Sequence, residues 1–163
     1  MSIEKLFEMQ SALDHYIEEN HQLQNENLFD RKVLALLVEI GELANETRSF
    51  KFWSVKPSSE KKVILEEFVD GVHFILSLGL ECGFQNQGLK IEKVVSTQDI
   101  NEQFLSIYQA VSIFQKTKSI NDYLHVFESY LQLGTLLGIK YEEIEQAYIE
   151  KNEVNYKRQN QNY

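Results

Sequence analysis

The scarcity of chain-breaking residues is the feature that most limits what this chain can fold into. The 163 residues include one proline, Pro57, and seven glycines. No stretch sustains the alternation of apolar and polar residues that half-buried strands show. Hairpins and sandwiches need frequent turns, which Gly and Pro commonly form. With 43% hydrophobic residues, the chain can bury a core. The sequence therefore predicts an all-α fold, with one domain over residues 1–163.

The spacing of apolar residues predicts a compact bundle of about six helices. We expect Asp30 to cap the second helix, and Ser58 or Ser59 to cap the third. The second and third helices are joined by a short connection, so they are expected to form an antiparallel hairpin. The predicted helices cover about 3–19, 31–47, 60–82, 100–116, 120–137 and 141–159. The residues expected to face the core of this hairpin include Leu34, Leu37, Ile40, Leu43, Val63, Ile64, Phe68 and Val72.

Two pairs of acidic residues lie on this predicted hairpin. Glu39 and Glu42 are three residues apart, so they share one face of a helix, and Glu67 and Asp70 repeat the arrangement on the next helix. Facing carboxylates repel one another unless a cation lies among them. Hard oxygen ligands suit Mg²⁺. A single such pair is common on a solvated helix face, but two tandem pairs on adjacent helices favour a metal site.

The last predicted helix carries a polar stripe. Tyr148, Lys151, Asn155 and Arg158 recur at spacings of three or four. Arginine offers a planar fork for phosphate oxygens, and lysine offers a mobile point charge. Asparagine is a poor helix former, so its recurrence here favours a binding role. The alternative is a solvated basic helix end that suits the helix dipole.

Polar residues also interrupt the apolar stripe of the first helix, at Gln10 and Asp14. A glutamine amide offers one donor and one acceptor, which match the N3–H and a carbonyl of a pyrimidine dione. The alternative is a buried amide that bonds to the backbone. Phe50, Phe52 and Trp53, in the connection between the acidic helices, could stack on a base or plug the end of the bundle.

The net charge of −9 argues against an electrostatic nucleic-acid or membrane-surface binder. It suits either a very soluble protein or one that concentrates divalent cations. No apolar stretch approaches the roughly 20 residues of a membrane span. The one cysteine, Cys82, excludes an internal disulfide and fits a reducing cytosol, so we expect a cytoplasmic protein.

These motifs together resemble a known family. The segment "EIGELANE", followed on the next helix by "EEFVD", resembles the all-α nucleoside triphosphate pyrophosphatases of the MazG-like superfamily. Within it, "ETRSFKFWS", the terminal "KNEVNYKRQNQNY" and "MQSALD" in the first helix are similar to the dimeric dUTPases. The likeness covers nearly the whole chain.

The resemblance implies a homodimeric, Mg²⁺-dependent enzyme that hydrolyses dUTP, and also dUDP, to dUMP, with attack at the β-phosphorus. Glu39, Glu42, Glu67 and Asp70 would bind the metal, and Glu39 would orient and deprotonate the attacking water. By position, Lys151, Asn152, Asn155, Arg158 and Gln159 would hold phosphates and sugar, Gln10, Asp14 and Trp53 would form the uracil pocket, and Lys51 or Lys56 would reach the phosphates.

The chain departs from that family at two positions. Asn162 precedes the final residue, Tyr163, where a glycine is expected, and Asp14 replaces a residue that is often an amide. The departure at Asn162 concerns the terminal turn, and the departure at Asp14 concerns the selection of the base.

Three other interpretations remain open at this point. The same acids could serve a pyrophosphatase for dCTP or a damaged nucleotide. Two D-x-x-H spacings, Asp70 with His73 and Asp122 with His125, could belong to a di-iron bundle, although such proteins use E-x-x-H. The fold could also be a non-catalytic binding module.

Overall fold

The computed structural model describes residues 1–92, 95 and 98–161. Within these residues the chain forms six α-helices, one 3₁₀ turn and no strand, which confirms the predicted all-α bundle. None of the described helices is long and apolar enough to cross a membrane. The elements are α1 (Ile3–Asn20), α2 (Phe29–Thr47), α3 (Lys61–Glu81), η1 (Phe84–Asn86), α4 (Ile100–Thr117), α5 (Ile120–Leu136) and α6 (Tyr141–Asn160).

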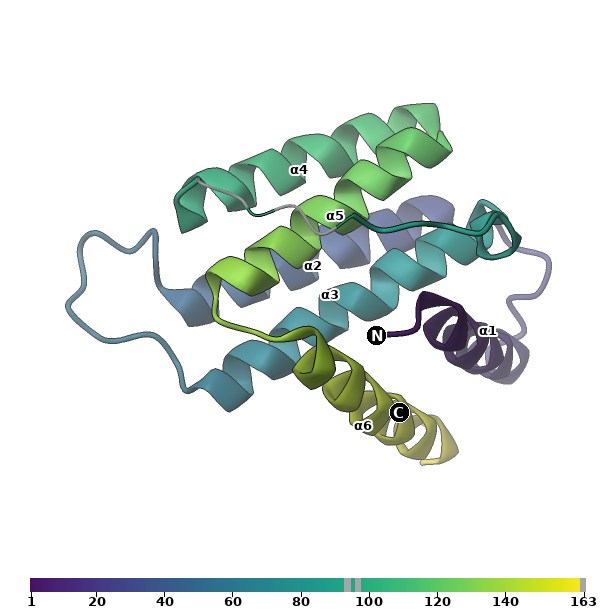
Figure 1. Ribbon diagram of the computed structural model, residues 1–163. Coiled ribbons are helices and arrows are strands. Elements are labelled where there is room, and N and C mark those ends of the chain that lie inside the picture. Colours follow the sequence, from purple (N-terminus) through teal and green to yellow (C-terminus); the bar gives the residue numbers. More distant parts are fainter. Residues whose placement is uncertain (93–94, 96–97, 162–163) are drawn as a thin grey trace.

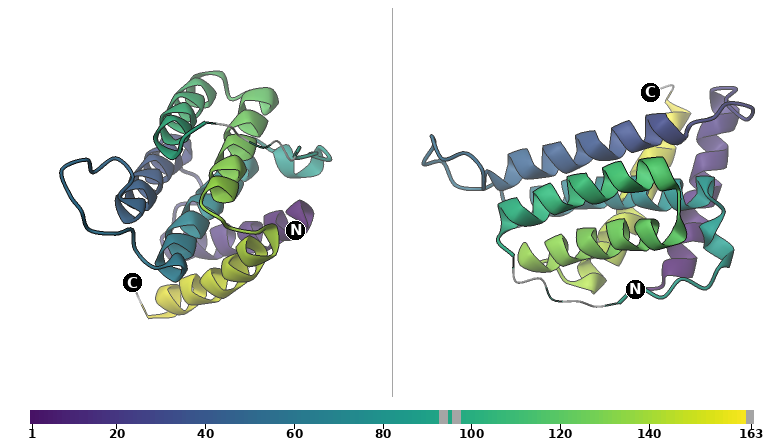
Figure 2. Two further views of the ribbon diagram at one scale, coloured as in Figure 1. Left: turned by 60° about the vertical axis from the view of Figure 1, so that its left-hand side comes forward. Right: turned by 90° about the horizontal axis from the view of Figure 1, so that it is seen from above.

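The α2–α3 hairpin lies in the middle of the molecule. The second hairpin, α4–α5, packs on one side of it, while α1 and α6 pack together on the other (Figure 1). The loop between α2 and α3 projects from one end of the bundle (Figure 2). The predicted antiparallel hairpin is therefore confirmed, and α3 contacts the helices on both sides.

Two predicted helix caps are wrong. The first residue of α2 is Phe29, whose N–H donates to the side chain of Asn27 at 3.1 Å. Asp30 lies inside the first turn instead. Ser59 does not cap α3, because its hydroxyl donates to the carboxylate of Glu46 and its N–H to the backbone carbonyl of the same residue. The tertiary contact between the hairpin ends thus replaces the local cap.

Two residues that we expected in the core are exposed. Leu34 keeps 63% of its surface and Val63 36%. The buried stripe of α2 includes Val33 and Leu36 instead, together with the predicted Ile40 and Leu43. In a leucine-rich helix several stripes satisfy the 3.6-residue period, so the period alone does not select the one that packs.

Two glycines of α3 let α5 approach closely. The hydroxyls of Tyr130 and Tyr123 each donate to a backbone carbonyl of α3 at 2.9 Å. A Cβ atom at Gly71 would overlap the hydroxyl of Tyr130, and one at Gly79 would overlap that of Tyr123. Because buried hydroxyls need partners, these contacts fix the position of the helix that carries Glu67, Asp70 and His73.

Candidate active site

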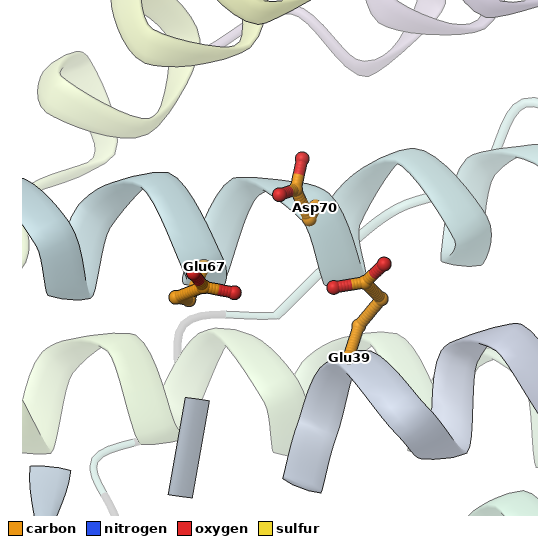
Figure 3. A group of neighbouring side chains, drawn as sticks. All are labelled: Glu39, Glu67 and Asp70. Carbon is orange, nitrogen blue, oxygen red and sulfur yellow. The ribbon is translucent and has the colours of Figure 1, made fainter. Parts of the chain in front are cut away.

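Four carboxylates on α2 and α3 form what we call the acidic cluster: Glu39, Glu42, Glu67 and Asp70. One oxygen each of Glu39, Glu67 and Asp70 lies within 4.8 Å of the others. Figure 3 shows Glu39 reaching from α2 toward the two acids of α3. Glu42 lies outside this group of three, but its charge acts on both Glu39 and Glu67. The hairpin therefore brings the two predicted pairs together.

The acidic cluster holds more negative charge than its surroundings neutralise. Burial, then the charges of Asp70 and Glu42, raise the pKa of Glu39 to about 7. Burial is also the largest cause of the raised pKa values of Glu67 and Asp70. Oε2 of Glu39 is buried and has no hydrogen-bond partner among the described residues. A buried carboxylate oxygen without a partner is costly, so this group suits an added cation.

A lysine of α6 contacts the acidic cluster directly. Nζ of Lys151 lies 2.7 Å from Oδ2 of Asp70 and lowers the pKa of that carboxyl, although burial outweighs it. Asn155, Arg158 and Gln159 line the same cavity as Lys151. Asn152 is buried, and its Nδ2 has no hydrogen-bond partner among the described residues. The predicted stripe thus lies along the site, while Asn162 and Tyr163 fall outside the described residues.

A cavity of about 390 Å³ runs from the acidic cluster toward α1. Glu39 and Asp70 line it, as do Gln10 and Asp14 of the first helix. The structure therefore places two of the four predicted metal ligands and two of the predicted base-binding residues around one space. This volume falls within the range of small-molecule pockets.

Gln10 forms the centre of a buried hydrogen-bond network at the α1 side of this cavity. Its Nε2 donates to Oδ1 of Asp14 at 2.8 Å. Its Oε1 lies 2.7 Å from Nδ1 of His73 and accepts from the hydroxyl of Tyr148 at 2.8 Å. The hydroxyl of Ser77 donates to Oδ2 of Asp14 at 2.5 Å. The predicted alternative, an amide that bonds only to the backbone, is therefore not what the structure shows.

Lys32 lies at the same side of the cavity, and the sequence analysis did not identify it. Its Nζ contacts Oδ2 of Asp14 at 3.6 Å, Glu18 at 3.4 Å and Glu81 at 2.5 Å. We call these three acids and Lys32 the lysine-centred cluster. Burial lowers the pKa of Lys32, but the three acids together raise it by more than burial lowers it, and the charge of Asp14 contributes most. The net shift is therefore upward. Its partners come from α1 and from the far end of α3, so only tertiary structure reveals it.

His73 is a second residue whose place in the wall of the cavity was not predicted from the sequence. It is buried as expected of a core histidine, and its ring stacks on Tyr148 with 4.1 Å between centroids. Burial, then the charge of Lys151, lower its pKa to about 3. Yet it lines the cavity, and its Nε2 has no hydrogen-bond partner among the described residues.

The loop that carries the predicted base-stacking residues projects away from the cavity. Phe52 and Trp53 pack edge to face, with exposed fractions of 93% and 64%. The residues that line the cavity do not include Trp53, Lys51 or Lys56. The base of the loop is fixed, since Arg48 donates to the hydroxyl of Ser54 at 2.6 Å. The aromatic residues therefore do not plug the end of the bundle.

The two D-x-x-H pairs do not form a ligand group. Among the described residues, the metal-type cluster consists of Glu39, Glu67 and Asp70 and contains no histidine. Asp122 instead accepts from the hydroxyls of Thr117 and Ser119 at the start of α5. The geometry gives the di-iron interpretation no support.

Comparison with known proteins identifies one family. A protein-family model described as dUTPase matches residues 2–163, nearly the whole chain. No curated protein matches the sequence.

Proposed function

The chain belongs to the dUTPase family and is a dUTP diphosphatase, and we propose that it uses Mg²⁺ and also converts dUDP to dUMP. The observation that carries the metal proposal is the convergence of Glu39, Glu67 and Asp70 within 4.8 Å. Their oxygens are the hard donors that Mg²⁺ prefers. The buried, unpartnered Oε2 of Glu39 fits a site built to receive a cation. When bound, Mg²⁺ would neutralise phosphate charge and favour the ionisation of water.

We assign the acids of the cluster separate roles. Glu42, Glu67 and Asp70 would hold the metal together with Glu39. Glu39 would also orient the attacking water and accept its proton. The water oxygen would form a bond to the β-phosphorus, and the bond from that phosphorus to the oxygen of the α-phosphate would break. The products are dUMP and pyrophosphate from dUTP, or dUMP and phosphate from dUDP.

The α6 side chains are the proposed contacts for phosphates and sugar. Lys151 already contacts Asp70 at 2.7 Å, which places its charge beside the acidic cluster. Asn155, Arg158 and Gln159 line the cavity next to it. Transfer of a phosphoryl group depends chiefly on positioning and on neutralised charge, and this stripe supplies both. Asn152, buried one turn after Tyr148, would complete the stripe.

The network around Gln10 and Asp14 is the proposed base end of the cavity. Trp53, Lys51 and Lys56 complete the proposed nucleotide contacts. Because these three residues do not line the cavity, their loop would have to approach it before they could touch a nucleotide. The exposed aromatic tip also supports the proposal of a homodimer, because a second copy of the chain would remove Phe52 and Trp53 from water. A reducing cytosol, the proposed location, suits the single cysteine, Cys82.

The proposed function is tested by pyrophosphate release from dUTP, dCTP, dTTP and UTP, with Mg²⁺ and with EDTA. We expect a preference for dUTP that requires Mg²⁺ and that is lost in Glu39→Gln and Asp70→Asn variants that keep their helical circular dichroism. A preference for another nucleotide would leave the proposed role of the acidic cluster intact and contradict the proposed base end of the cavity. Full activity in EDTA would overturn the metal proposal.

A further inference from the structure

His73 presents a buried nitrogen, Nε2, that has no hydrogen-bond partner among the described residues. Buried polar atoms normally have partners, so an exception in the wall of a cavity points to a ligand. Whether this nitrogen donates or accepts depends on where the ring carries its proton. The position of the proton follows from the hydrogen bonds that link His73 to Gln10 and Gln10 to Asp14.

Asp14 is surrounded by groups that suit a carboxylate anion. It faces the ammonium of Lys32 at 3.6 Å and accepts from the hydroxyl of Ser77 at 2.5 Å. An ionised carboxylate only accepts hydrogen bonds. The atom of Gln10 that lies 2.8 Å from Asp14 must therefore be its NH₂ group. With the amide reversed, two oxygens would face each other at that distance, so Asp14 fixes the orientation of the amide.

The fixed amide in turn fixes the ring of His73. Oε1 of Gln10 faces Nδ1 of His73 at 2.7 Å and the hydroxyl of Tyr148 at 2.8 Å. An amide oxygen only accepts, so both of these partners donate. Nδ1 of His73 therefore carries the proton. Because burial keeps the imidazole neutral at physiological pH, with its pKa lowered to about 3, Nε2 holds a lone pair.

We propose that Nε2 of His73 accepts the N3–H of the uracil base, and that Asp14 and Gln10 act as positioning residues that hold its proton on Nδ1. The inference rests on the proposed base end of the cavity. Uracil carries a hydrogen at N3, whereas cytosine carries a lone pair there. Cytosine in the same position would set two acceptors against each other and leave the buried nitrogen unpaired, which disfavours it.

The proton position can be read directly by NMR on protein labelled with ¹⁵N at histidine. The two ring nitrogens give separate signals according to which one is protonated, and the signals absent from His73→Phe assign the ring. We expect a proton on Nδ1 and a bare Nε2 in the wild type. We expect the Nε2 signal to move when dUMP is bound to saturation, and to stay in place with dCMP.

Two variants test the chain of contacts. In Asp14→Asn the amide of Gln10 can reverse, so the proton should be shared between both nitrogens of His73. In His73→Phe the acceptor is lost, and we expect kcat/KM for dUTP to fall roughly 10- to 100-fold while that for dCTP changes less. Glu81→Gln is the matched control, because it also removes one charge next to Lys32 but does not touch Gln10. It should leave both the proton position and the preference for dUTP over dCTP unchanged.

The outcomes separate this inference from the proposed function. Any of three results would overturn the inference. They are a proton on Nε2, an Nε2 signal that does not move when dUMP binds, and an unchanged preference for dUTP over dCTP in His73→Phe. The proton position in Asp14→Asn gives a test even if His73→Phe fails to fold. Loss of dUTP hydrolysis in the wild type would instead contradict the proposed function, whatever the tautomer.

Discussion

Two groups of carboxylates lie at different parts of one cavity, and they differ in one respect. In the lysine-centred cluster, Asp14, Glu18 and Glu81 surround the ammonium of Lys32. In the acidic cluster, Lys151 forms an ion pair with Asp70, whose pKa the charge of Arg158 also lowers, and Oε2 of Glu39 has no hydrogen-bond partner among the described residues. The first group therefore surrounds its cation, whereas in the second the cation of Lys151 pairs with one acid.

The difference shows in the electrostatics. The acids around Lys32 raise the pKa of the lysine, because they stabilise its protonated form. In the acidic cluster the pKa values of Glu39, Glu67 and Asp70 are all raised, since burial and mutual repulsion disfavour their ionised forms. On the proposed function, the carboxylates around Lys32 are structural, whereas those of the acidic cluster receive an external cation.

The largest expected effect is on catalysis, in a matched pair of Glu→Gln variants. Glu39→Gln should lower kcat for dUTP by roughly 10²- to 10⁴-fold, the usual contribution of a general base. Glu81→Gln, in the lysine-centred cluster, should retain kcat within a small factor. Steady-state assays with Mg²⁺ compare the two. Equal losses would remove the distinction between the clusters.

The second prediction exchanges the cations. Lys32→Met should reduce the free energy of unfolding by about 1–3 kcal/mol, because it leaves three partly exposed acids without their partner. Lys151→Met should cost less, because the acidic cluster can take its cation from solution. Urea unfolding with and without Mg²⁺ measures both. Mg²⁺ should restore much of the stability of Lys151→Met and little of that of Lys32→Met.

The third prediction concerns pH. Since the pKa of Glu39 rises from 4.5 to about 7 on folding, the native protein holds a proton that the unfolded chain releases. The metal-free protein should therefore lose stability as the pH rises from about 4.5 to 7. Glu39→Gln should show a smaller loss over this window, and Mg²⁺ should raise Tm more at pH 8 than at pH 5.5.

A second titrating group overlaps with this window. The pKa of His73 is lowered from 6.5 to about 3 on folding. Between these values the unfolded chain binds a proton that the folded protein does not, so the contribution of His73 to stability grows as the pH rises to about 6.5. It is present in both proteins, so the difference between wild type and Glu39→Gln isolates Glu39. Identical pH profiles of Tm for the two metal-free proteins would contradict the assignment.

The smallest expected effect is on the stability of the single chain when the loop tip is changed. Trp53→Ala removes an exposed side chain, so the free energy of unfolding should change by no more than about 0.5 kcal/mol. If the loop reaches nucleotide, KM for dUTP should rise while Tm stays constant. A large drop in Tm measured at low protein concentration would show that Trp53 packs within its own chain.

The sequence was sufficient for the helices and for the acids, because both depend on local spacing. The 3.6-residue period located every helix to within about two residues, and three of the four acids of the two i, i+3 pairs converged. The predicted caps of α2 and α3 were wrong. At α2 the first N–H donates to Asn27, and at α3 Ser59 bonds to Glu46 across the hairpin instead of to its own helix.

The cation of the lysine-centred cluster and the acceptor on His73 could not be predicted. Lys32 meets Glu81 from 49 positions away, and Gln10 meets His73 from 63. No local pattern encodes these pairings. Asp14 was expected to touch the base, and its contacts with Lys32, Ser77 and Gln10 give it a positioning role that only the packing of α1 on α3 makes visible.

The most direct test of the central claim is calorimetric titration of Mg²⁺ into the metal-free wild type, Glu39→Gln and Glu81→Gln at pH 7. Repeating it in buffers with different heats of ionisation counts the protons released. The acidic cluster should bind Mg²⁺ and release protons in the wild type and in Glu81→Gln, and both signals should be lost or greatly weakened in Glu39→Gln. Equal Mg²⁺ binding and proton release in all three proteins would contradict the claim that the carboxylates without a central cation form the metal site.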